Sequence, residues 1–294
     1  MRMIRPALAA ALALGLLAPG CGPTSSAPSQ GAALQAERAQ SRGLLSELRR
    51  RDMLIADRAL NRYVDDVTAR LDRTRPRGAP SLRTFIVKDP NVNAFTTGAG
   101  YVFVTAGLLG ALENEAQFAF VVAHEIAHVD LGHVAQGAMN RQRTSALAGL
   151  GAVLATAAGL PPELARTGAG IGAQLAVADF SREQETQADE RGLRYHARAG
   201  WDPVEGAASF EVLRRLYGEA RGAAAFLASH PASGDRQARL VRLARAEGVA
   251  GGEVGAQRFL GRTAELRRAL LGFYRQEGRT AEARQMRRNL NRTR

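Results

Sequence analysis

The chain has 294 residues, 46% of them hydrophobic, which is enough for one substantial domain with a buried core and a small appendage. The formal net charge is +12, but Lys88 is the only lysine and no basic segment is interleaved with aromatic residues, so we expect no nucleic-acid partner. Cys21 is the only cysteine, which excludes an internal disulfide and a zinc site built from cysteines.

The N-terminus has the layout of a bacterial secretory signal over residues 1–21. Two arginines precede the apolar segment 6–18, and Cys21 follows it. This arrangement resembles the lipobox of bacterial lipoproteins, although Ala18 and Pro19 replace the usual leucine and small residue. We therefore expect an exported, periplasmic protein with Cys21 as the candidate lipid anchor to the outer membrane. The alternative is an ordinary secretory signal with an incidental cysteine.

The segment after the signal is expected to link it to a folded domain. Residues 22–35 are small, polar and proline-bearing, which predicts a flexible tether. Apolar residues then recur at helical spacing over 36–71. Two β-branched and aromatic segments, Thr84–Val87 and Tyr101–Thr105, are predicted strands, joined either as a hairpin or as two strands of one sheet across the turn residues between them.

The rest of the chain predicts helices, so the expected fold is mainly α with a small β-sheet. An uncharged stretch, 144–162, is rich in Ala and Gly and predicts a buried or membrane-grazing helical hairpin rather than a membrane span. We assign 36–246 to the main folded domain and 247–294 to a helical extension, in which one tetratricopeptide-like hairpin is an alternative to unrelated amphipathic helices. The predicted helices are 113–139, 181–199, 204–217, 237–246 and two within 263–290.

The segment VVAHEIAHVD contains the pattern HExxH on a predicted helix. Residues four apart lie on one helix face, so His124 and His128 can direct both imidazoles at one zinc ion. Glu125 lies beside them and can act as a general base toward the attacking water. The alternative is a core helix whose histidines are satisfied by other polar partners.

A third ligand is expected downstream, in SREQETQADERG. Glu185 and Asp189 are four apart and share a face with the small residues Ala188 and Gly192, which would permit close packing against the motif helix. The pattern predicts Glu185 as third ligand and Asp189 as the group that orients a ligating histidine. A solvated acidic helix face is the alternative. On a continuous helix His133, nine residues after His124, lies about half a turn away from it and cannot bind the same ion. It is expected to contact a ligand residue rather than the metal, or to have a structural role.

These blocks, together with the upstream segments NAF and GxxYVFVTAGLL, resemble the gluzincin zinc metallopeptidases of family M48, which includes HtpX, the CAAX prenyl proteases and the BepA-like enzymes. The absence of strong apolar segments after the signal favours the exported, BepA-like branch. The resemblance implies that 36–246 is a zinc metallopeptidase domain, with one Zn²⁺ ion ligated by His124, His128 and Glu185 and with Glu125 as base. It also implies that His230, in the HP step of ASHPASGDR, is a candidate switch ligand that holds the enzyme latent; a loop-stabilising histidine is the alternative.

The expected activity is hydrolysis of peptide bonds in unfolded or misassembled envelope proteins. An extended protein or peptide substrate could pair with a sheet edge, and the candidate edge residues are Asn93, Ala94, Phe95, Tyr101, Val102 and Phe103. A second function class remains open, in which the chain is a latent protease that acts mainly as a chaperone-like binding module for envelope protein assembly.

Overall fold

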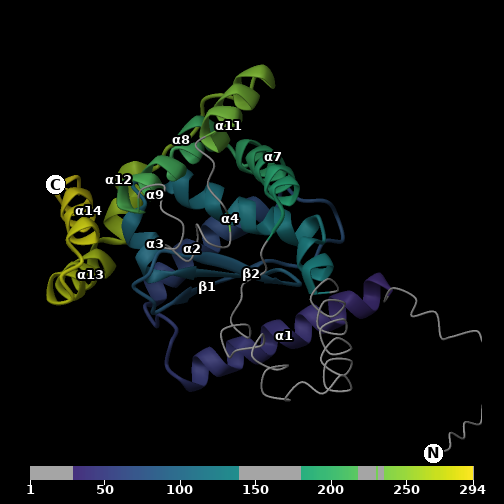
Figure 1. Ribbon diagram of the computed structural model, residues 1–294, viewed down its shortest axis with the longest axis horizontal. Helices are drawn as coiled ribbons and strands as arrows, with labels where there is room; N and C mark the ends of the chain where they lie inside the picture. Colours follow the sequence, from purple (N-terminus) through teal and green to yellow (C-terminus); the bar gives the residue numbers. More distant parts are fainter. Residues whose placement is uncertain (1–28, 139–179, 218–229, 231–234, 294) are drawn as a thin grey trace, which may run out of the picture.

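The computed structural model describes residues 29–138, 180–217, 230 and 235–293 (Figure 1). The signal, Cys21 and the uncharged stretch 144–162 lie outside these residues. The described part is mainly helical with one three-stranded sheet, as the sequence predicts. None of the helices described is both long enough and apolar enough to cross a membrane.

Two helices, α1 (Gln30–Arg50) and α2 (Arg58–Asp72), replace the continuous helical pattern predicted over 36–71. The first begins inside the segment predicted as a tether, because the Ser29 side chain accepts a hydrogen bond from the backbone of the first turn and caps the helix. The break follows from Asp52, whose φ of 52° is left-handed and ends the helix.

The sheet contains a strand that the sequence analysis assigned to a turn. Strands β1 (Arg83–Val87), β2 (Ala94–Gly98) and β3 (Tyr101–Thr105) lie in the order β1-β3-β2. β1 and β3 pair in parallel, so of the two predicted alternatives the hairpin is wrong and two strands of one sheet is confirmed; β2 and β3 form the antiparallel pair. The tight turn between β2 and β3 is possible because residues 98–100 all have positive φ, two of them as glycine.

This order corrects part of the predicted substrate edge. Tyr101, Val102 and Phe103 lie on the central strand β3, whose backbone pairs with β1 on one side and β2 on the other. A strand paired on both sides has no free donors and acceptors for another chain. Only the segment of Ala94 and Phe95, on the outer strand β2, retains an edge position.

Helices cover both faces of the sheet (Figure 1). α1 lies against one face, where Leu45 packs with Phe103 and Val87. On the other face, Val102 and Val104 share a core with α2, with α4 (Glu115–Asp130) and with α3 (Ala106–Ala111). Most of α4 is buried, because it lies between the sheet and a further layer of helices.

That further layer consists of α7 (Arg182–Arg198), α8 (Pro203–Ala207), α9 (Ser209–Tyr217) and α11 (Asp235–Ala246). The helix predicted over 204–217 is in fact two, α8 and α9. The helix predicted over 113–139 is also interrupted, because Gly132 takes a left-handed φ of 70° directly after α4. The chain becomes helical again at residues 133–138.

The C-terminal segment forms three helices, α12 (Ala256–Arg262), α13 (Ala264–Gln276) and α14 (Thr280–Asn291). α12 was not predicted. The hairpin of α13 and α14 packs against α3, and its side chains Tyr274 and Met286 belong to the main core. Arg267 of α13 is fully buried and donates hydrogen bonds to the backbone carbonyls at the end of α3, those of Leu109, Gly110 and Leu112.

Replacing Arg267 with alanine is expected to destabilise the fold by about 3 kcal/mol, because it removes a packed side chain and leaves buried carbonyl groups with fewer donors. Burial lowers the pKa of Arg267 to about 9, so the cost of desolvating the guanidinium offsets part of the stability that its hydrogen bonds and packing contribute. Urea unfolding would measure the change. Arg268→Ala is the matched control, since Arg268 is exposed and should change stability by less than about 0.5 kcal/mol. A loss under about 1 kcal/mol for Arg267→Ala would contradict this account.

Candidate metal centre

The motif helix α4 presents its polar residues to the interior. Asn114 caps the helix by accepting a hydrogen bond from the backbone N–H of Gln117 at 2.8 Å. His124, Glu125 and His128 lie on its buried second half, with 2% or less of each residue exposed. Buried polar groups of this kind require partners, and the neighbouring helix α7 supplies them.

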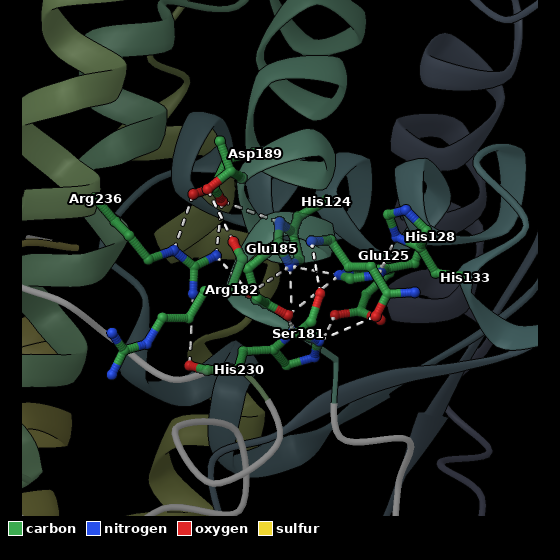
Figure 2. A network of polar contacts seen from close by, with 12 residues as sticks. His124, Glu125, His128, His133, Ser181, Arg182, Glu185, Asp189, His230 and Arg236 are labelled. Atoms are coloured by element: carbon green, nitrogen blue, oxygen red, sulfur yellow. Dashed lines mark hydrogen bonds and ion pairs between the residues drawn. The ribbon is translucent and has the colours of Figure 1, made fainter. Parts of the chain in front are cut away.

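Helix α7 begins in a capping box, in which the Ser181 and Gln184 side chains each accept from the other's backbone. The predicted close packing of α7 on α4 is confirmed at Gly192, where an added Cβ would lie 3.0 Å from the backbone nitrogen of His124. This approach directs Glu185 and Asp189 at the motif helix, so the structure brings together the residues that the sequence analysis grouped (Figure 2).

Donor atoms of four side chains converge between the helices. Nε2 of His124 lies 3.1 Å from Nε2 of His128, and these two atoms lie 3.5 and 3.4 Å from the nearest carboxylate oxygens of Glu185. His230 is the fourth side chain, with its Nδ1 3.2 Å from Nε2 of His124 and 2.8 Å from Glu185 Oε1. Ligand atoms arranged tetrahedrally at about 2.1 Å from a zinc ion lie about 3.4 Å apart, so this spacing fits one ion.

The contact of His124 with Asp189 supports the same conclusion. Its Nδ1 lies 3.1 Å from Oδ1 of Asp189, so a neutral ring carries its proton there and directs the lone pair of Nε2 into the site. A second imidazole nitrogen, from His128, faces that lone pair in a buried position. Convergent lone pairs and a carboxylate form a donor set that a cation would satisfy.

Two arginines that the sequence analysis did not single out hold the carboxylates. Arg236 donates to both oxygens of Asp189, at 2.9 and 2.7 Å, and its Nη2 lies 2.8 Å from Oε2 of Glu185. Arg239 lies 2.8 Å from Asp189. Arg236 is part of the ASHPASGDR segment, but nothing in its spacing from His230 indicated a contact with α7.

The environment sets the charge of each group. Burial alone would raise the pKa of both carboxyls, but the surrounding histidines hold that of Glu185 well below its usual range, and Arg236 lowers that of Asp189 to about 2. Burial lowers the pKa of His128 to about 3, so it is neutral at pH 7, as a ligand must be. Burial would also lower the pKa of His230, but its carboxylate neighbours raise it to about 9.

The general-base candidate Glu125 lies directly beside these atoms. It is fully buried, and its Oε1 lies 3.2 Å from Nε2 of His230. Its Oε2 has no hydrogen-bond partner among the described residues. Burial raises the pKa of Glu125, but the nearby histidines, His230 first, lower it by more and keep the carboxylate ionised.

The upstream block NAF contributes a buried residue, Asn93, immediately before the edge strand β2. Asn93 is 8% exposed, and its Oδ1 has no hydrogen-bond partner in the described part of the chain. Its backbone is held by Thr105, whose hydroxyl accepts from the Asn93 N–H at 2.9 Å.

Comparisons with known proteins give the family of this chain. Residues 56–244 match the model of Peptidase family M48. The chain is 33% identical over 196 residues to a putative beta-barrel assembly-enhancing protease of Vibrio cholerae, covering 64% of this chain and 40% of that protein. It is 34% identical over 161 residues to the mitochondrial metalloendopeptidase OMA1 of Arabidopsis thaliana, covering 55% and 31%.

A third relative is metalloprotease LoiP of Escherichia coli K12, 32% identical over 171 residues, which cover 58% of this chain and 64% of LoiP. The chain thus spans two fifths or less of the length of the first two relatives. The matched residues include α4, α7 and the whole donor set. This chain belongs to peptidase family M48.

Proposed function

We propose that this chain is a zinc-dependent endopeptidase of the bacterial cell envelope that hydrolyses peptide bonds in unfolded or misassembled proteins. The observation that carries the proposal is the convergence of His124, His128 and Glu185 on one point, with Glu125 beside it. The name metalloendopeptidase of one relative supports the reaction class, and the name beta-barrel assembly-enhancing protease of another supports the envelope setting.

His124, His128 and Glu185 would hold the zinc ion, and Asp189 would orient His124. A zinc ion there supplies a Lewis acid that polarises the scissile carbonyl and acidifies the attacking water. Glu125 would take the proton of that water and pass it to the leaving amine. The outer edge of β2, at Ala94 and Phe95, would hold the substrate backbone in an extended conformation, so that recognition depends little on side chains.

The test is proteolysis by the mature chain of a protein without stable structure, such as casein. We expect digestion by the zinc-loaded protein, loss of digestion after removal of metal with a chelator, and recovery on addition of one equivalent of zinc. Digestion that persists in protein shown to be free of metal would contradict the proposal.

A second candidate function rests on His230. Nδ1 of His230 lies next to the donor atoms of the other three residues. Four protein ligands would fill every position of a tetrahedral zinc ion and leave none for water or substrate, as in structural zinc sites. We propose that His230 can give up the proton that Glu125 and Glu185 stabilise in the metal-free site, occupy the fourth position and hold the enzyme latent. A chain that stays in this state would act mainly as a chaperone-like binding module for envelope protein assembly.

His230→Ala is therefore expected to raise casein digestion about tenfold, because substrate no longer competes with a protein ligand. The measurement is the initial rate at saturating zinc. Glu211→Gln, an exposed change on α9, is the control. An unchanged or reduced rate in His230→Ala would count against latency.

The cellular location is also a proposal. The secretory layout of residues 1–21 supports export to the periplasm, and Cys21 is the residue through which the chain would be anchored to the outer membrane. Radiolabelled palmitate incorporated by the full chain, and not by Cys21→Ser, would test the anchor.

A further inference from the structure

His133 lies beside the metal-ligand candidates without joining them. The left-handed Gly132 turns the chain back after α4, and His133 is 1% exposed next to His128. Its Nδ1 lies 3.0 Å from Nδ1 of His128, and its Nε2 lies 3.1 Å from Oε1 of Gln187 on α7. Both ring nitrogens of His133 are therefore engaged, and neither belongs to the set of converging donor atoms.

The positions of the protons along these contacts follow from one requirement. For Nε2 of His128 to offer its lone pair to a metal ion, the neutral ring must carry its proton on Nδ1. That N–H then donates to Nδ1 of His133, which must be unprotonated to accept it. The proton of His133 is consequently on Nε2, from which it donates to Gln187.

The orientation of the Gln187 amide agrees with this direction. Its nitrogen lies 3.3 Å from Oε1 of Glu183, one turn earlier on α7, where it can only donate. The amide oxygen is thereby left facing His133, as an acceptor. The three hydrogen bonds, from His128 to His133, from His133 to Gln187 and from Gln187 to Glu183, therefore all donate in the same direction. Reversing any one of them would place two donors or two acceptors against each other.

We propose that His133 and Gln187 are positioning residues that fix the tautomer of His128 and thereby the zinc affinity of the site. The proposal rests on the proposed function, since it concerns the same metal. The two histidine ligands are then oriented by different means: His124 by the carboxylate of Asp189, and His128 by a neutral imidazole that is itself held by an amide. Outer partners of this kind typically change metal affinity 10- to 100-fold.

The test is the zinc dissociation constant of the full mature chain at pH 7.5, measured by competition with a chromophoric chelator. Gln187→Met removes the acceptor at an exposed position of α7, where the fold should tolerate it, and is expected to weaken zinc binding about tenfold. His133→Leu should weaken it by about 10- to 100-fold. Gln187→Glu restores an acceptor and should return the constant to the wild-type value or below. Glu190→Gln on the same helix is the control, since the Glu190 carboxylate pairs with Arg194 at 3.7 Å.

Thermal unfolding of the metal-free proteins separates this role from a structural one. We expect metal-free Gln187→Met to unfold within about 2 °C of the wild type, since surface substitutions cost little. Nitrogen NMR of histidine-labelled, zinc-loaded protein should show the His128 proton on Nδ1. The proposal would be overturned if Gln187→Met and His133→Leu bound zinc with the wild-type dissociation constant. It would also be overturned if Gln187→Met bound zinc more weakly and Gln187→Glu did not restore the wild-type constant. Failure of the wild type itself to bind zinc would instead refute the proposed function.

Discussion

Glu125→Gln is expected to reduce kcat/KM for casein by about 10²- to 10⁴-fold while the protein still binds zinc with wild-type stoichiometry. The amide has the shape of the carboxylate but cannot accept a proton from the attacking water at neutral pH. Glu125 is buried among histidines that keep it ionised, so the wild-type side chain is available as a base. Because Glu125 is outside the group of converging donor atoms, its loss should leave the metal in place.

The measurement pairs casein kinetics with the zinc content of each purified protein. Glu211→Gln makes the same chemical change on the exposed surface of α9 and should leave both values unchanged. Activity of Glu125→Gln within about threefold of the wild type would show that another group acts as base, since a true base contributes at least about 10². Loss of zinc together with activity would show that Glu125 is needed for the site itself.

Glu185→Gln is expected to weaken zinc binding by more than about 100-fold, exceeding the effect typical of an outer partner. The substitution replaces an anionic ligand with a neutral amide in a buried site. It also removes a charged partner of Arg236, which retains Asp189.

The loss should be visible in stability as well as in affinity. Zinc at 100 times the wild-type dissociation constant stabilises the folded protein by about 2.7 kcal/mol, through preferential binding to the native state. At that concentration Glu185→Gln should gain well under 1 kcal/mol, because it would be about half saturated or less. Glu190→Gln on the same helix should respond as the wild type does. An equal zinc-induced rise in melting temperature for Glu185→Gln would remove this residue from the ligand set.

The sequence predicted the helices that carry the chemistry better than the sheet. The spacing of the motif histidines, and of Glu185 and Asp189, depends only on helical geometry, so both segments could be assigned locally. Strand β2 was not predicted because its two threonines and Gly98 resemble turn residues, and only pairing with β3 makes it a strand. The parallel pairing of β1 and β3 is likewise a tertiary contact with no local signal.

The outer residues of the site were harder to predict for the same reason. Arg236 and Arg239 reach Asp189 from α11, and their roles depend on how that helix packs on α7. His133 was expected to make an outer contact, but on the assumption that the motif helix continued through it. The interruption at Gly132 gives His133 its actual position against His128.

X-ray absorption at the zinc edge of the purified mature chain tests most directly whether two helices bring their side chains to one ion. We expect one zinc per chain, bound only by nitrogen and oxygen at about 2.0–2.1 Å with at least two imidazoles, and a changed spectrum in Glu185→Gln. No bound zinc, or a spectrum of a fully hydrated ion that Glu185→Gln leaves unaltered, would contradict the account.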